Sequence, residues 1–327
     1  MTSPAKSFTR ANQPNFSPLE QALLSTLAWF DLSRYPVTTF EAWYYLYSQD
    51  KLPPITPAEV GLALRQLEDK GQVESQQGFW QLSGRENYLP SRLGRARLAI
   101  VKRQRAWAGA RLIACLPLVR FVGLVNTVAW EASAPGSDID LFIVLPPRRL
   151  FLGRLLVALV VQLRGWRRYS DHITNRLCLS FFVTADQLDL SPFALSNDPY
   201  LKFWVASVVP LSNRYGVYEQ FLAANSWVGK NLPNWKGCTV DALARTQHQS
   251  VAEKSHGFLW WLGNGLESLA RTIQLPRLRR YLGKRLNDGS TAVVVSSRVL
   301  KMHTNDRRIE LAQAFFDRLR QLGIDVL

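Results

Sequence analysis

The sequence has little cysteine, few acidic residues relative to its basic ones, and no apolar run long enough to cross a bilayer. Its three cysteines, Cys115, Cys178 and Cys238, lie far apart, and none belongs to a Cys-x-x-Cys pair. This spacing excludes a cysteine-rich zinc site and a disulfide framework, and it is typical of a reducing, intracellular compartment. We therefore expect a cytoplasmic protein.

The most apolar segment spans residues 150–163 and is interrupted by Arg154. It is shorter than the ~20 residues that a membrane-spanning helix needs, so we expect no integral membrane span and interpret the segment as a helix buried against a sheet. Arginines flank it, which leaves contact with lipid phosphates open as an alternative. The polar residues at the start lack the apolar centre of a signal peptide and predict a disordered arm over residues 1–16.

Basic residues outnumber acidic ones by 40 to 25, which gives a formal net charge of +15. Such a charge favours contact with polyanions such as nucleotides, nucleic acid or an acidic membrane surface. Two segments carry much of it: residues 85–120 contain Glu86 as their single acid, and residues 271–285 contain none. A solvated, inert basic surface is the alternative interpretation.

The first folded segment, residues 17–90, begins with three helix starts of one kind. Each has a serine or threonine followed three residues later by glutamate, the capping-box pattern, at Ser17, Thr38 and Thr56. Two alternating stretches around Gln76-Gln77-Gly78 then predict a hairpin. Three helices and a two-stranded ribbon resemble a winged-helix module. The exposed positions of its third helix are of mixed charge, so DNA contact and a packing or protein-contact role both stay open.

Residues 137–144 have the composition of a β-strand with two carboxylates near its beginning. Side chains two apart on a strand share a face, so Asp138 and Asp140 point together and Ile139 points away. Adjacent carboxylates repel unless a cation lies between them, which favours a divalent metal. The alternative is a strand end that carries two solvated acids.

A second apolar strand over residues 120–126 precedes this one and ends at Asn126-Thr127, about ten residues before Ser137-Asp138-Ile139-Asp140. The arrangement resembles the nucleotidyltransferase superfamily related to DNA polymerase β. The resemblance implies an α/β (α+β) fold with a small mixed sheet, over residues 91–235. It also implies that Asp138 and Asp140 are catalytic and bind Mg²⁺ or Mn²⁺, and that Asn126, Thr127 and Ser137 contact a nucleoside triphosphate.

The chain departs from the pattern of that superfamily at two places. Asn126-Thr127 replaces a Gly-Ser turn, although asparagine tolerates the left-handed conformation and threonine retains a hydroxyl. The superfamily also takes a third carboxylate from a later strand, whereas the corresponding residues 176–183 contain no acid. We expect Ser180 to lie in the position of that missing carboxylate.

Residues 236–327 are predicted to form a mostly helical C-terminal region. Within it, Lys301-x-His303-x-x-Asp306-x-Arg308 resembles a stretch of an uncharacterised bacterial branch of the same superfamily that carries an N-terminal winged helix. The resemblance implies that Lys301 and Arg308 hold a triphosphate and that His303 and Asp306 handle a proton or a ligand. The alternative is a helix start in which Asn305 or Asp306 caps residues 309–319.

These residues together predict a metal-dependent nucleotidyltransferase that moves a nucleoside monophosphate from a nucleoside triphosphate to an unidentified acceptor hydroxyl. The expected partners are the nucleoside triphosphate and, as acceptor, nucleic acid or another polyanion. A catalytically degenerate nucleotide- or nucleic-acid-binding protein on the same fold is the main alternative. A metal-dependent glycosyltransferase ranks last, because the chain opens with helices and not with a nucleotide-binding βαβ unit.

Overall fold

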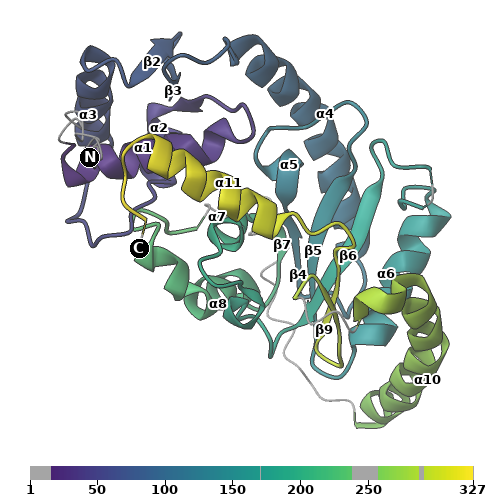
Figure 1. Ribbon diagram of the computed structural model, residues 1–327. Coiled ribbons are helices and arrows are strands. Elements are labelled where there is room, and N and C mark those ends of the chain that lie inside the picture. Colours follow the sequence, from purple (N-terminus) through teal and green to yellow (C-terminus); the bar gives the residue numbers. More distant parts are fainter. Residues whose placement is uncertain (1–15, 170, 238–256, 287–290, 327) are drawn as a thin grey trace, which may run out of the picture. The chain divides into compact units, whose positions relative to one another are not determined.

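The computed structural model describes residues 16–169, 171–237, 257–286 and 291–326, in a mixed α/β arrangement (Figure 1). Two compact units can be distinguished. Unit 1 consists of Met1–Glu86, Asn231–Asn234 and Gln313–Leu327, and unit 2 of Asn87–Lys230 and Trp235–Ala312. Nearly all of the predicted disordered arm, as well as Cys238, lies outside the described residues.

The three predicted helix starts of unit 1 are confirmed. At each of them the hydroxyl of the N-cap residue accepts a hydrogen bond from the backbone three residues on, and the glutamate there accepts one from the N-cap backbone. These reciprocal bonds satisfy two N–H groups that a helix start otherwise leaves open. The helices are α1 (Pro18–Asp31), α2 (Thr39–Tyr44) and α3 (Pro57–Asp69).

The predicted hairpin is also confirmed, as part of a three-stranded antiparallel sheet. Its strands are β1 (Val37–Thr38), β2 (Val73–Gln76) and β3 (Phe79–Leu82), in the order β1-β3-β2. Gln77 and Gly78 connect β2 to β3, both with positive φ (51° and 82°). A two-residue turn of this kind matches the right-handed twist of the strands that it joins.

The end of the chain completes the core of unit 1. The last helix, α11 (Arg308–Gln321), brings Phe315 against the ring of Trp29 at 5.7 Å and the ring of Tyr47 at 5.3 Å between centroids. Asp31 forms an ion pair with Arg318 of the same helix and another with Arg85 at 3.0 Å. Residues distant in sequence therefore form one hydrophobic cluster.

Unit 2 is built on a six-stranded sheet in the order β7-β4-β5-β6-β9-β8. Only β5 and β6 pair in parallel, and the other neighbours are antiparallel. The strands predicted over residues 120–126, 137–144 and 176–183 are confirmed, and the sheet also includes a hairpin, β8 and β9, from the C-terminal region that the sequence predicted to be mostly helical. The strands are β4 (Phe121–Leu124), β5 (Ile139–Leu145), β6 (Leu177–Thr184), β7 (Val209–Asn213), β8 (Val293–Val295) and β9 (Val299–Met302).

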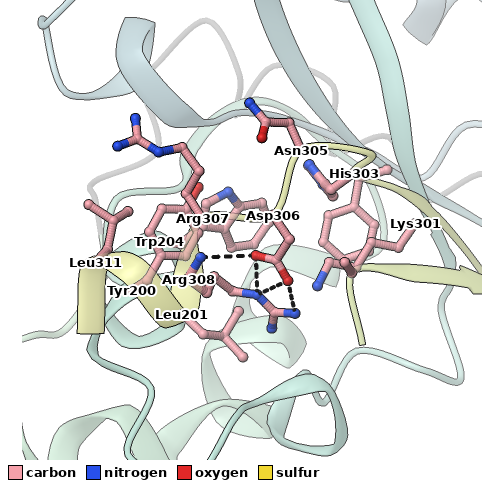
Figure 2. A pocket seen from close by; sticks show the side chains of 12 residues that line it. Tyr200, Leu201, Trp204, Lys301, His303, Asn305, Asp306, Arg307, Arg308 and Leu311 are labelled. Atoms are coloured by element: carbon pink, nitrogen blue, oxygen red, sulfur yellow. Dashed lines mark hydrogen bonds and ion pairs between the residues drawn. The ribbon is translucent and has the colours of Figure 1, made fainter. Parts of the chain in front are cut away.

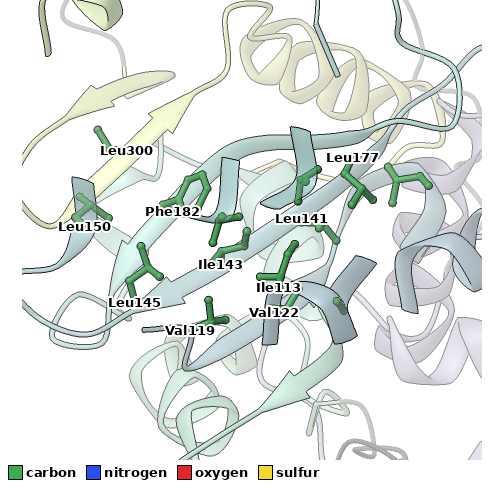
Figure 3. Close-up of a cluster of buried hydrophobic side chains, with 14 of the residues drawn as sticks. Ile113, Val119, Val122, Leu141, Ile143, Leu145, Leu150, Leu177, Phe182 and Leu300 are labelled. Carbon is green, nitrogen blue, oxygen red and sulfur yellow. The ribbon is translucent and has the colours of Figure 1, made fainter. Parts of the chain in front are cut away.

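One face of this sheet is mostly aliphatic, with Phe182 among its side chains (Figure 3), and residues of three helices belong to the same buried cluster. Ile139, Leu141 and Ile143 of β5 point into this cluster, as the alternation along a strand requires. Among the helices, α6 is the predicted buried segment, and within the described residues no helix is both long and apolar enough to cross a membrane. The helices on this face are α4 (Leu89–Ala114), α6 (Leu150–Leu163) and α10 (Gly257–Leu282).

The opposite face is aromatic. The ring of Phe142 lies 5.0 Å from that of Phe181 and 5.6 Å from those of Trp204 and Phe221. Asp140 lies two residues before Phe142 and therefore faces this side. The short elements here and at the edges are α5 (Asn126–Ala129), α7 (Pro199–Ala206), α8 (Val217–Ala224) and the 3₁₀ turns Ser191–Phe193, Ser226–Lys230 and Gly283–Leu286.

Alanine substitutions at two glycines of α4 can test how closely this helix contacts the sheet. A Cβ at Gly109 would lie 2.6 Å from Cδ1 of the fully buried Leu177, whereas a Cβ at Gly94 would meet nothing within 4 Å. We predict that Gly109→Ala lowers the free energy of unfolding by about 1–2 kcal/mol, because overpacking exceeds the gain in helix propensity. Gly94→Ala, the matched control, should raise it by ~0.5–1 kcal/mol. Urea denaturation of the full chain measures both, and equal effects would contradict this description of the contact.

Candidate functional site

Asp138 and Asp140 converge with a third side chain at the start of β5. One carboxylate oxygen of each, together with Sγ of Cys178, lie within 4.8 Å of one another. Cys178 is brought there because β6 runs parallel to β5 and pairs it directly with Asp140. The expectation that the two carboxylates share a face is therefore confirmed.

Arg168 already supplies a positive charge to this cluster. Its Nη1 donates to Oδ2 of Asp138 at 2.5 Å and lies 3.7 Å from Sγ of Cys178. The arginine side chain is 44% exposed, whereas that of Asp138 is only 15% exposed. The guanidinium thus reaches in from solvent and neutralises one of the two carboxylates.

Asp140 lies deeper than Asp138, and its environment disfavours the charged form. Burial raises the pKa of Asp140 to about 6, and the neighbouring charge of Asp138 contributes to the increase. A hydrogen bond from the Asn126 amide to Oδ2 of Asp140, at 2.9 Å, acts in the opposite direction. Any cation beside this carboxylate would favour its ionised form.

Asn126 replaces the glycine of the expected turn and adopts the left-handed conformation, with φ of 58°. Its side chain also makes contacts that glycine cannot make. The amide nitrogen donates to Asp140, while Oδ1 accepts from Nε1 of Trp204 at 2.8 Å and from the Tyr200 hydroxyl at 3.4 Å. Thr127 follows it and is exposed. Asn126 therefore connects Asp140 to the aromatic side chains of α7.

Ser137 is held by a buried lysine that the sequence did not single out. Nζ of Lys102 donates to the backbone oxygen of Ser137 at 2.5 Å and to its hydroxyl at 3.0 Å. Burial lowers the pKa of Lys102, and the charge of Asp138 opposes this effect. Lys102 is one of nine basic residues between Arg85 and Arg120, and only the fold distinguishes it from the exposed ones.

Cys178, and not Ser180, pairs with Asp140. A register shift in the pairing of β5 with β6 places Cys178 opposite Asp140 and Phe181 opposite Phe142. The Ser180 hydroxyl instead accepts from Sγ of Cys178 at 3.4 Å. Burial raises the pKa of the Cys178 thiol, and the charges of Asp140 and Asp138 raise it further, so the neutral thiol is favoured.

The residues predicted near the C-terminus lie around a separate pocket of unit 2 (Figure 2). Nζ of Lys301 donates to the backbone oxygen of Thr291 at 2.8 Å. Arg308 is 4% exposed and donates to Asp306 at 2.7 Å and to backbone and hydroxyl oxygens nearby. The carboxylate of Asp306 also accepts from the backbone N–H of Arg308, at the start of α11. This contact matches the alternative of a helix start.

The donor atoms at Asp138 and Asp140 fit a single divalent cation. Carboxylate oxygens are the ligands that Mg²⁺ and Mn²⁺ prefer. Within the described part of the chain, the cluster contains a thiol as its third group and no third carboxylate. Two ions bridged by three carboxylates therefore do not fit these side chains, whereas the two carboxylates offer ligands for one ion.

No protein-family model, curated protein or solved structure matches this chain.

The partly buried position of His303 should make the stability of the fold depend on pH. Burial, together with the charges of Lys301 and Arg308, lowers the pKa of His303 from 6.5 to about 4. The unfolded chain therefore binds a proton below pH ~6.5 that the folded chain does not accept until pH ~4, and stability is lost as the pH falls through this interval. We expect His303→Phe to remove up to ~3 kcal/mol of this loss.

The measurement is urea denaturation at several pH values between 4 and 7.5, because only the difference between variant and wild type isolates His303. His172→Phe is the control, since His172 is exposed. Parallel stability curves for wild type and His303→Phe would contradict a depressed pKa.

Proposed function

We propose that unit 2 is a nucleotidyltransferase-type domain of the DNA polymerase β-like superfamily. It binds one divalent cation and a nucleoside triphosphate at Asp138 and Asp140, and it transfers the nucleoside monophosphate to an acceptor hydroxyl. The observation that supports this most is the convergence of the two carboxylates next to the left-handed turn at Asn126. Antiparallel pairing of β4 with β5 brings the turn and the carboxylates together.

Each side chain has a part in this proposal. Asp138 and Asp140 would hold Mg²⁺ or Mn²⁺, which supplies positive charge to the phosphates when bound. Thr127, exposed beside the turn, offers a hydroxyl donor to a phosphate oxygen. Arg168, once released from Asp138, can pair with phosphate, because a guanidinium suits phosphate oxygens as well as carboxylate oxygens. Lys102 keeps the loop at Ser137 in place.

We further propose that unit 1 is a winged-helix module. Its three capped helices and small antiparallel sheet support this. The positions of α3 that the sequence predicted to be exposed are exposed, and they carry both charges: Glu59, Arg65, Gln66, Glu68, Asp69 and Lys70. A mixed face of this kind is better suited to contact with protein than to phosphates, which need cations.

The test of the main proposal is calorimetric titration of each nucleoside triphosphate with Mn²⁺ into the full chain. We predict that Asp138→Asn and Asp140→Asn each weaken metal-dependent binding at least ~10-fold, since each removes an anionic ligand of the cation. The control is Asp186→Asn, an acid outside the cluster that pairs with Arg298 at 3.3 Å. Equal affinity in wild type and both cluster variants would contradict the proposal.

A nucleotide-binding protein without turnover is the second candidate, and Cys178 is the observation that favours it. The third side chain of the cluster is a neutral thiol and not a carboxylate. Labelled nucleoside triphosphates that bind without releasing pyrophosphate would support this candidate. Cys178→Asp should then create pyrophosphate release, whereas Cys178→Ser should not.

Arg168 should compete with the metal. We predict that Arg168→Ala raises the affinity for Mn²⁺ in the absence of nucleotide about 3- to 10-fold, because the variant removes the cation that pairs with Asp138. Arg164→Ala is the matched control, an exposed arginine just after α6. Weaker Mn²⁺ binding in Arg168→Ala would show that the arginine assists the site.

A further inference from the structure

A pocket of about 190 Å³ in unit 2 is lined by aromatic rings. Phe181 comes from β6, Tyr200 and Trp204 come from α7, and His303 follows β9 (Figure 2). The ring of Phe181 lies 5.4 Å from that of Trp204 and 5.8 Å, edge to face, from that of His303. The volume is below the ~300–1,000 Å³ of typical small-molecule sites, so the pocket accommodates part of a larger ligand.

The cations of this pocket are already paired with protein groups. Lys301 donates to a backbone oxygen and Arg308 to Asp306 and its neighbours. The third, Arg307, forms an ion pair with Glu310 at 3.1 Å. The pocket is therefore a poor place for a phosphate group, in contrast to the role that the sequence implied for Lys301 and Arg308.

Two polar side chains of the pocket have no such partner. Neither ring nitrogen of His303 and neither amide atom of Asn305 has a hydrogen-bond partner among the described residues, although both side chains line the pocket. A neutral imidazole offers one donor and one acceptor, and a carboxamide offers both kinds as well. His303 is partly exposed and Asn305 is exposed, so both side chains can offer these groups to a ligand with a hydrogen-bonding edge.

The same pocket is connected to Asp140 through hydrogen bonds. Tyr200 and Trp204 line the pocket and donate to Asn126, which donates to Asp140. Phe181 pairs with Phe142, which follows Asp140 by two residues on β5, a separation of roughly 7 Å on a strand. A ribose and a phosphate chain can bridge a separation of this size.

We propose that this pocket binds the nucleobase of the nucleotide whose phosphates bind at Asp138 and Asp140. A planar base packs against the partly exposed ring of Tyr200, beside the buried rings of Phe181 and Trp204, and its edge forms hydrogen bonds with His303 and Asn305. The inference rests on the proposed nucleotidyl transfer and adds to it the residues that recognise the base.

Unphosphorylated nucleosides test the pocket separately from the metal site. Adenosine, guanosine, cytidine and uridine are each titrated into the full chain and followed by ligand-observed NMR. We expect at least one to bind the wild type and to bind Asp138→Asn equally well, since it has no phosphate to contact the metal site. His303→Phe keeps the ring but loses the polar edge, and it should weaken binding at least 10-fold.

Two further variants keep the test decisive if His303→Phe folds poorly. Asn305→Ala changes an exposed residue and should weaken binding 3- to 10-fold, while Leu311→Trp should abolish it by filling the pocket. Exposed His172 provides the control variant His172→Phe, which should bind like the wild type. Absence of binding by all four nucleosides, or equal binding by wild type, Asn305→Ala and Leu311→Trp, would overturn the nucleobase proposal.

The outcomes separate this inference from the proposed function. If nucleoside triphosphates bind in a metal-dependent way but the pocket variants have no effect, the nucleobase pocket is wrong and the metal site stands. If nucleosides bind in the pocket but metal and phosphates add no affinity, the pocket stands and nucleotidyl transfer at the Asp138 and Asp140 pair is wrong.

Discussion

The repulsion between the carboxylates of Asp138 and Asp140 is the constraint on which the candidate site depends. The two groups lie side by side in a place that is largely closed to solvent, where like charges interact more strongly than in water. A different interaction compensates the negative charge of each carboxylate. Arg168 forms an ion pair with Asp138, while Asp140 receives the Asn126 amide and has its pKa raised to about 6.

Arg168 and Asn126 differ in whether they can move away from their carboxylates. This difference explains how the site could still accept a cation although both carboxylates already have partners. Arg168 reaches in from solvent, so it can leave when a stronger positive charge arrives. Asn126 cannot leave, because Trp204 and Tyr200 hold its oxygen and its backbone is fixed in the left-handed turn. In the proposed metal site the deeper carboxylate would therefore keep its position, while the outer one would exchange its partner.

The two faces of the sheet in unit 2 differ in their contacts. One face packs against helices, and the other carries the residues of the candidate site. The aliphatic face binds helices α4, α6 and α10 through one hydrophobic cluster. The other face carries the carboxylates, the aromatic rings and the pocket. One strand, β5, contributes to both faces because its side chains alternate. A substitution on the aliphatic side can thus alter stability without changing the groups that face a ligand.

Local signals in the sequence predicted much of this architecture. Residues close in sequence determine three of its features: the capping boxes of unit 1, the Gln77-Gly78 turn and the apolar segment of α6. The sequence pattern is therefore sufficient to predict them. The convergence of Asp138 and Asp140 followed from strand alternation alone.

What the sequence did not reveal depends on contacts between distant segments. Because of a register shift between β5 and β6, Cys178 and not Ser180 pairs with Asp140. The sequence of neither strand indicates this shift. The burial of Lys102 against Ser137 and of Arg308 against Phe193 and Asp198 arises only when separate elements meet. In the sequence Lys102 is merely one of nine cations in a basic segment, and Arg308 stands out only through the resemblance of its motif. The aromatic pocket likewise combines β6, α7 and the segment after β9.

Anomalous X-ray diffraction from crystals grown with Mn²⁺ and a non-hydrolysable nucleoside triphosphate tests the central claim most directly. The account predicts one Mn²⁺ peak in coordination contact with carboxylate oxygens of both Asp138 and Asp140, with Arg168 displaced from Asp138 toward the phosphates. A nucleotide bound elsewhere, with Arg168 still paired to Asp138 and no Mn²⁺ peak beside it, would contradict the account.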